Sequence, residues 1–268
     1  MSRRKLPFLL GVLACAAGCE GLKARHRASL GAELYKKGDY QNALYKFEQA
    51  AQLDPNIDAL HSNLAFTYLQ LFHASPKSAT GKAYGGLAVK SFEEYLRRRP
   101  PTDESAQKAR DYLIATFVDT QRYDDAVAFF KPEVERPRPN LEAIFTLGQI
   151  AAKTGRIQEA FNWYQKRIDM APNDPDGPYN FGVLVWDHLR NHPEVAGNDR
   201  MALADRGLAA LRKSMEMRSK DPNGFIYANL LYRERSAGQP DDVTKAADIA
   251  EADRFKKQAE DLLKSGSK

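Results

Sequence analysis

The sequence predicts an all-α protein built from repeated pairs of helices. A similar order of leucine, glycine, tyrosine, alanine and phenylalanine occurs six times along the chain, in places at intervals of 34 residues. Glycine or proline stands where many of these helices should end. The chain has 268 residues and is 43% hydrophobic, which is enough apolar surface for a stack of small repeated units.

The first twenty residues have the pattern of a bacterial export signal. A basic stretch, Arg3-Arg4-Lys5, precedes an apolar stretch from Leu6 to Ala17 that is too short to span a bilayer as a stable helix. Gly18-Cys19 follows, and the whole arrangement resembles the lipobox of bacterial lipoproteins. The resemblance implies that residues 1–18 are a signal peptide, that Cys19 is lipidated and that residues 19–27 form a short tether.

Alternatives to this interpretation stay open. Ala16 stands where lipoproteins usually have leucine, and Val12-Leu13-Ala14-Cys15 is a second candidate lipobox with a very short apolar stretch before it. An ordinary signal peptide or an uncleaved anchor has a similar composition. Glu20 occupies the place where aspartate signals retention in the inner membrane, so we expect a lipid anchor in the outer membrane, with the body facing the periplasm.

The clearest helix pair begins near Arg25. It contains, in order, Leu30-Gly31, Tyr35, Gly38-Asp39-Tyr40, Ala43, Phe47, Ala50 and Asp54-Pro55. This order closely resembles the tetratricopeptide repeat. We expect small residues, Gly31 and Ala43, where the two helices cross, Gly38 in the left-handed conformation that ends a helix, and Pro55 where the second helix stops.

The same pattern returns in five further pairs. They are recognised at Leu64-Ala65, Leu113-Ile114, Leu147-Gly148, Phe181-Gly182 and Leu230-Leu231. The resemblance implies a right-handed superhelical solenoid of about six helix-turn-helix units over residues 28–265. The charged helix expected from Val243 to Lys264, with Ile249, Phe255, Ala259 and Leu262 as its apolar residues, is predicted to cap the solenoid. A coiled-coil partner helix is the alternative.

Composition and motifs favour a binding protein over an enzyme. Without the three basic residues of the signal, Lys+Arg falls from 40 to 37 against 35 Asp+Glu, so the net charge falls from +5 to +2 and nucleic acid is not an expected partner. The two cysteines, Cys15 and Cys19, provide no disulfide framework for the body. No phosphate-binding loop, dinucleotide fingerprint or nucleophile motif occurs, so we expect no catalytic residue, cofactor, metal or small-molecule substrate.

One histidine pair needs separate treatment. His188 and His192 are four residues apart and would share a helical face, as the zinc ligands of some metalloproteases do. Leu189 stands where the general-base glutamate would be, and Pro193 ends the helix. We therefore interpret the pair as two polar residues at a helix end.

The resemblance also suggests where partners bind. In tetratricopeptide proteins the first helix of each unit lines a concave groove that holds a peptide segment or a helix. The repeat alignment assigns groove positions to Tyr35, Phe66, Gln70, Phe145, Gln149, Tyr179, Trp186 and Tyr232. Asn63, Asn180 and Asn229 share one repeat position at which asparagine holds an extended peptide in some members, whereas Ser29, Tyr112 and Thr146 replace it in other units. Packing between units and bonds between helices are the alternative roles.

Two insertions separate the helices of the second and fifth units. They run from His73 to Gly86 and from Arg190 to Asp205, and both contain proline and glycine. We expect them to project as loops that either bind or are merely tolerated. The function that we predict is a membrane-anchored scaffold that assists assembly of an envelope complex, such as a pilus, a secretin or the outer-membrane machinery. The alternative is a regulatory adaptor that docks an envelope enzyme such as a peptidoglycan hydrolase or a protease.

Overall fold

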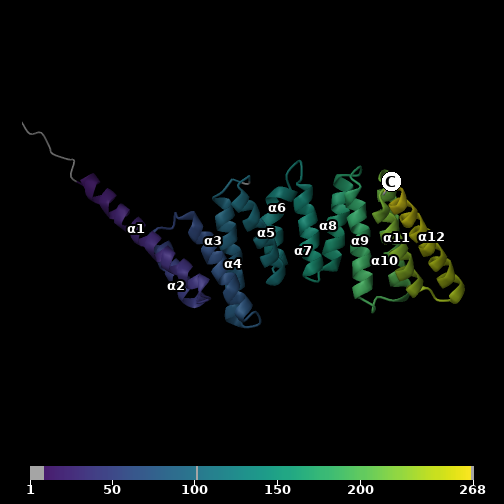
Figure 1. Ribbon diagram of the computed structural model, residues 1–268, viewed down its shortest axis with the longest axis horizontal. Coiled ribbons are helices and arrows are strands. Elements are labelled where there is room, and N and C mark those ends of the chain that lie inside the picture. Colours follow the sequence, from purple (N-terminus) through teal and green to yellow (C-terminus); the bar gives the residue numbers. More distant parts are fainter. Residues whose placement is uncertain (1–8, 101, 267–268) are drawn as a thin grey trace, which may run out of the picture. The chain divides into compact units, whose positions relative to one another are not determined.

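The structure, a computed structural model, describes residues 9–100 and 102–266, with side chains for residues 20–100 and 102–265. This described part of the chain is all-α, with twelve helices and no strand (Figure 1). The helices follow one another as six helix-turn-helix pairs, from α1 and α2 to α11 and α12. They fall into an N-terminal unit, Met1–Phe129, and a C-terminal unit, Phe130–Lys268.

The N-terminal unit is held together by phenylalanine residues between its helices. It contains α1 (Leu9–Lys36), α2 (Tyr40–Leu53), α3 (Asp58–Ala74), α4 (Ala79–Arg97), α5 (Glu104–Asp119) and the start of α6 (Tyr123–Val134). Phe47, Phe92 and Phe117 are almost completely buried. At Gly31 a Cβ atom would lie only 2.8 Å from the Phe47 ring, which confirms the close helix crossing expected there.

The helix boundaries follow the predicted glycine and capping signals. Gly38 has a φ of +78° and Gly155 a φ of +77°, so each ends its helix in the left-handed conformation. Asp39, Asp103 and Asn140 cap the next helices, because their side chains accept hydrogen bonds from backbone N–H groups of the first turn. These local signals set the helix-turn-helix pairing.

The C-terminal unit ends in the predicted capping helix. It contains the end of α6, then α7 (Leu141–Lys153), α8 (Ile157–Met170), α9 (Asp176–Asn191), α10 (Gly197–Met217), α11 (Pro222–Gly238) and α12 (Asp242–Gly266). Leu147, Leu211 and Leu231 are fully buried in its core. On α12, Ala252, Phe255 and Ala259 are buried whereas most other residues are exposed, as a cap requires.

The prediction that the two insertions project as loops is wrong. Residues 79–86 begin α4 and residues 197–205 begin α10, so only residues 75–78 and 192–196 connect the helices. The inserted residues form additional helical turns, which satisfy their own backbone hydrogen bonds. At the start of α4, the Ser78 hydroxyl accepts a 2.8 Å hydrogen bond from the Gly81 N–H and caps the extended helix.

A buried arginine fixes the connection between α9 and α10. The Arg200 guanidinium donates hydrogen bonds to the carbonyl oxygens of Leu189 (2.9 Å), His192 (3.0 Å) and Val195 (2.7 Å). The same side chain is only 7% exposed and pairs with Glu234 on α11. One cation therefore bonds carbonyl groups at the end of α9 and in the turn that follows it.

The first helix is longer than the repeat requires. We expected the solenoid to begin at residue 28 after a tether, but α1 begins at Leu9 and continues without interruption to Lys36. Ala24 is fully buried, so part of the predicted tether belongs to the packed body. The lipidation of Cys19 stays a prediction, since its side chain lies outside the described residues.

Candidate functional site

A cavity of about 660 Å³ opens between the first helices of consecutive pairs in the N-terminal unit. We call it the aromatic pocket. Residues from α1, α3 and α5 line it, together with one from α2: Ala32, Tyr35, Lys36, Phe47, Asn63, Phe66, Leu69, Gln70, His73, Tyr112, Ala115 and Asp119. Its size lies within the usual range for ligand sites.

Edge-to-face aromatic contacts build one wall of the aromatic pocket. The ring of Phe66 lies 5.2 Å from that of Phe92 and 4.7 Å from that of Tyr112, nearly perpendicular to both. Phe92 is fully buried, which fixes Phe66 against the core, whereas Tyr112 is 49% exposed at the surface. The wall thus presents large, rigid apolar groups that are held in place before any partner arrives.

The polar side chains of the aromatic pocket differ in whether they already have partners. Gln70 hydrogen-bonds the Tyr35 hydroxyl, and the His73 ring lies 3.4 Å from the Asp119 carboxylate. Burial raises the pKa of Tyr35, so its hydroxyl stays protonated. The Asn63 carboxamide makes no hydrogen bond to any other described residue, which leaves a donor and an acceptor available to a ligand.

The structure brings the four predicted groove residues of this unit together. Tyr35, Asn63, Phe66 and Gln70 all line the aromatic pocket. The repeat alignment placed Tyr112 at the position of Asn63, but it was not predicted to line the groove. It also missed the His73–Asp119 pair and Lys36, which follow from helix geometry and not from the repeat pattern.

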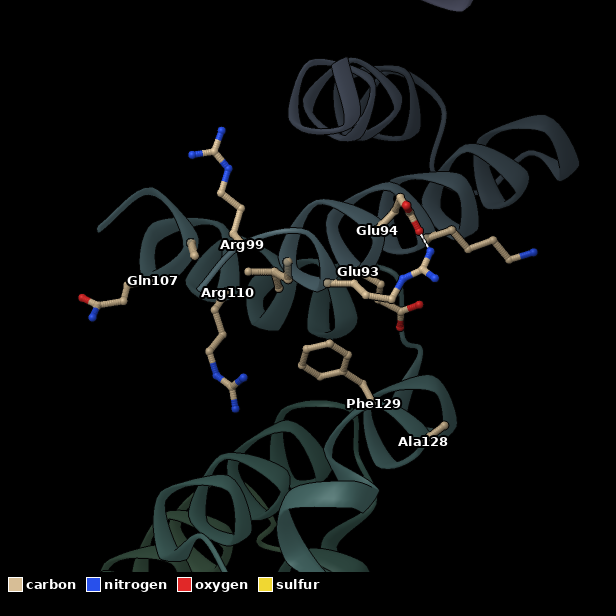
Figure 2. Close-up of a pocket in the computed structure, with 11 residues that line it drawn as sticks. Glu93, Glu94, Arg99, Gln107, Arg110, Ala128 and Phe129 are labelled. Atoms are coloured by element: carbon tan, nitrogen blue, oxygen red, sulfur yellow. Dashed lines mark ion pairs between the residues drawn. The ribbon is translucent and has the colours of Figure 1, made fainter. Parts of the chain in front are cut away.

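A second cavity, the outer cavity, lies between α4, α5 and the start of α6 and measures about 670 Å³ (Figure 2). It opens on the other side of α5 from the aromatic pocket, because residues 106, 107 and 110 line one and residues 112, 115 and 119 the other. Its rim is charged, and Glu94, Arg97 and Arg99 already have partners. Glu94 pairs with Arg97, and Arg99 donates a 3.2 Å hydrogen bond to Asp103.

Glu93 is a further carboxylate that lines the outer cavity. Burial raises its pKa, and the charge of Asp125 raises it further. The outer cavity therefore combines paired charges with a carboxyl group whose ionised form is disfavoured. The aromatic pocket, with its unpaired carboxamide and preformed wall, is the better candidate site.

In the C-terminal unit, α9 and α11 share an aromatic cluster. The ring of Tyr227 lies 5.8 Å from that of Tyr179 and 5.3 Å from that of Trp186, and all three are half-buried. The Arg190 guanidinium lies 5.2 Å from the Trp186 ring. Tyr179 and Trp186 were predicted, whereas Tyr227 was missed because it stands two residues before the aligned Asn229.

Two other predicted groove residues pack inside the C-terminal unit. Tyr232 is 8% exposed, accepts a 2.9 Å hydrogen bond from Arg212 and stacks on Phe255 of the capping helix. Its assignment to a groove is wrong, because α12 covers the place where a partner would lie. Phe145 of α7 is half-buried, and its ring lies 5.5 Å from the Tyr164 ring of α8.

The remaining predicted polar residues also differ in whether their side chains already have hydrogen-bond partners. Gln149 is exposed on α7. Asn180 makes no side-chain hydrogen bond to another described residue, whereas Asn229 accepts a 3.0 Å bond from Arg233 one turn further on. The Asn229 bond lies within α11, so among the described residues none of the three asparagines makes the bond between helices that was the alternative.

The histidine pair lies at the end of α9. The rings of His188 and His192 are 4.4 Å apart, and His192 lies 2.6 Å from the Glu194 carboxylate. Burial lowers the pKa of His188, and the charge of His192 lowers it further. Among the described residues no group of three or more histidine, cysteine or acidic side chains could hold a metal ion. None of the described helices has the length and hydropathy that a membrane span needs.

Comparisons with known proteins agree with this architecture. Residues 31–71 match a model described as TPR repeat, and residues 141–174 match the tetratricopeptide repeat model. No curated protein has a sequence that matches the chain.

The comparison with solved structures finds proteins that are only distantly related in sequence and that superpose with low TM-scores. The crystal structure of MamA is 15% identical and covers 88% of this chain and 96% of its own, with a TM-score of 0.37. YrrB, described as a TPR protein with an unusual peptide-binding site, is 13% identical and covers 90% of this chain and 91% of its own, with a TM-score of 0.32. A tetratricopeptide repeat protein from Parabacteroides merdae is 16% identical and covers 91% and 98%, with a TM-score of 0.34. Each unit therefore contains one segment that matches a tetratricopeptide repeat model, and helix-turn-helix pairs continue throughout the described residues.

Proposed function

We propose that this chain is a protein-protein interaction scaffold that holds a segment of a partner protein in the aromatic pocket. The observation that carries the proposal is the preformed wall of Phe66 and Tyr112 beside the unpaired Asn63 carboxamide. An apolar side chain of the partner would fill the pocket, and the carboxamide would bond its backbone. The ligand class that suits both features is a peptide segment with an apolar side chain and a free backbone amide group.

We further propose that the scaffold acts at the bacterial envelope, anchored by a lipid on Cys19 and facing the periplasm from the outer membrane. The basic stretch, the apolar stretch and Gly18-Cys19 support the anchor. The partner that we propose is a subunit of an envelope complex under assembly, such as a pilus, a secretin or the outer-membrane machinery.

Co-purification from crosslinked envelopes tests the pocket. We expect the wild type to capture a defined envelope subunit and Tyr112→Ala to lose most of it. Tyr45→Ala is the matched control, because Tyr45 is 56% exposed on α2 and does not line the pocket. Equal capture by all three proteins would refute the pocket as the binding site, and recovery of hydrolases or proteases would favour the adaptor function.

Radioactive lipid labelling tests the anchor separately. We expect Cys19→Ala to abolish incorporation of labelled palmitate and Cys15→Ala to leave it unchanged. Labelling that persists without Cys19 would disprove the proposed lipidation site, whereas labelling that needs Cys15 would move the lipidated residue by four positions.

A further inference from the structure

The outward face of α1 carries a group of basic residues directly after position 19. The group comprises Lys23, Arg25 and His26, with Leu22 beside it, and we call it the basic face. Leu22 is 72% exposed, and Lys23, Arg25 and His26 are exposed as well. No side chain of the basic face forms an ion pair or hydrogen bond with another described residue, so its charges are available to a ligand.

Helix geometry separates this face from the packed side of α1. Ala24 and Gly31 are buried on the side that meets α2, and Gly21 faces Asp54, whose carboxylate lies 3.8 Å from a Cβ built there. Because each residue turns the helix by about 100°, positions 22, 23 and 26 point away from that side. The unpacked side of α1 near residue 20 is therefore both basic and partly apolar.

The same geometry relates the basic face to the proposed anchor. Leu22, Lys23 and His26 follow position 19 by three, four and seven residues, and α1 is continuous through this segment. Residues at these spacings share one face of a helix with the starting position. A lipid on residue 19 would hold this face at the membrane surface, and the free charges would meet the headgroups.

From these contacts we infer that the basic face of α1 is a membrane-contact surface for anionic phospholipids. Leu22 enters the interface, and Lys23 and Arg25 bind the headgroups. The opposing charges nearby are Glu20, which is exposed, and Asp54 on the packed side. The inference rests on the proposed membrane placement but not on the chemistry of the lipid.

A partition experiment with the full chain tests the surface. The protein equilibrates between neutral phosphatidylcholine vesicles and vesicles that contain phosphatidylglycerol, and its amount on each is measured after separation. Any hydrophobic anchor binds both kinds of vesicle, so the ratio between them reports the charges. With about a fivefold gain for each of the two basic residues near an anionic surface, we expect the wild type to favour the anionic vesicles on the order of 25-fold at low salt.

The matched variants remove the same charge from two places. Lys23→Gln/Arg25→Gln should bring the ratio close to one, whereas Lys256→Gln/Lys257→Gln on the exposed side of α12 should leave it high. Melting curves of both variants check that the fold is kept. Equal partition of the wild type, or an equal loss in both variants, would overturn the inference. Palmitate labelling is measured separately, so failure of the anchor and failure of the basic face give different results.

Discussion

Replacing Gly148 by alanine tests the close crossing of α7 and α8. The added Cβ atom would lie 2.5 Å from Cε2 and 2.6 Å from Cδ2 of Tyr164. The Tyr164 ring cannot swing away, because it is 6% exposed and packs edge-to-face on Phe145 at 5.5 Å. Overpacking of this kind costs about 1–3 kcal/mol, while alanine gains about 1 kcal/mol over glycine inside a helix. Because the 2.5 Å contact is severe, the upper end of this range applies, and we expect a net loss of about 2 kcal/mol of unfolding free energy.

Gly86→Ala is the matched control for this prediction. Its Cβ atom would also make a close contact, at 2.4 Å, but with the end of the flexible Arg122 side chain. That side chain moves at little cost, so the helix preference of alanine should win and stabilise the protein by up to about 1 kcal/mol.

Urea unfolding measures both free energies, and hydrogen exchange locates the change. We expect faster exchange in α7 and α8 of the Gly148 variant and little change in α3 and α4, because solenoid contacts are made between neighbours. A Gly148 variant as stable as the wild type would refute the packing argument. If Gly86→Ala lowered the free energy of unfolding as much as Gly148→Ala does, the loss would come from replacing glycine itself and not from the contact with Tyr164.

Three further predictions concern polar groups. Asn63→Ala should weaken partner binding about tenfold in a binding isotherm with an unchanged melting curve, whereas Asn229→Ala, whose carboxamide already bonds Arg233, should bind as the wild type does. The pKa of His188 is lowered in the folded state, so below about pH 6.5 the unfolded chain binds more protons than the folded chain does. The free energy of unfolding should therefore decrease as the pH is lowered through this range, and urea titrations of His188→Gln should show a smaller decrease. Arg200→Met should lower the free energy of unfolding by about 3–5 kcal/mol in thermal unfolding, because Glu234 and three carbonyl groups lose the hydrogen bonds that Arg200 donates. A smaller loss than that caused by Glu234→Gln would contradict this role.

The repeat pattern predicted the helix pairs well because its signals are local. Gly38 and Gly155 adopt the left-handed conformation, and Gly31 and Gly148 lie where a larger side chain would clash with the next helix. The sequence therefore marks each of these positions by a glycine. The pattern failed where a residue has a role outside the consensus. Gly81, Gly85 and Gly86 suggested a loop, yet all three are buried inside α4.

The candidate site was predictable only in part, for a related reason. The alignment placed Tyr35, Phe66 and Gln70 on one surface because equivalent positions of successive first helices meet in space. It could not show that Tyr232, at an equivalent position, lies under the capping helix, because a cap does not follow the consensus. Nor could it show which carboxamides were already bonded, since Arg233 is not a repeat residue.

The Arg200–Glu234 pair has a consequence for how this chain can gain or lose repeats. The two residues are 34 positions apart, so the turn that closes one helix pair depends on a carboxylate supplied by the next. A deletion that removed α11 and α12 would take away the counter-charge of Arg200 and uncover a guanidinium that is 7% exposed in the full chain. Evolutionary shortening from this end would therefore need a compensating substitution at position 200, and a fragment designed to end after α10 should carry one as well.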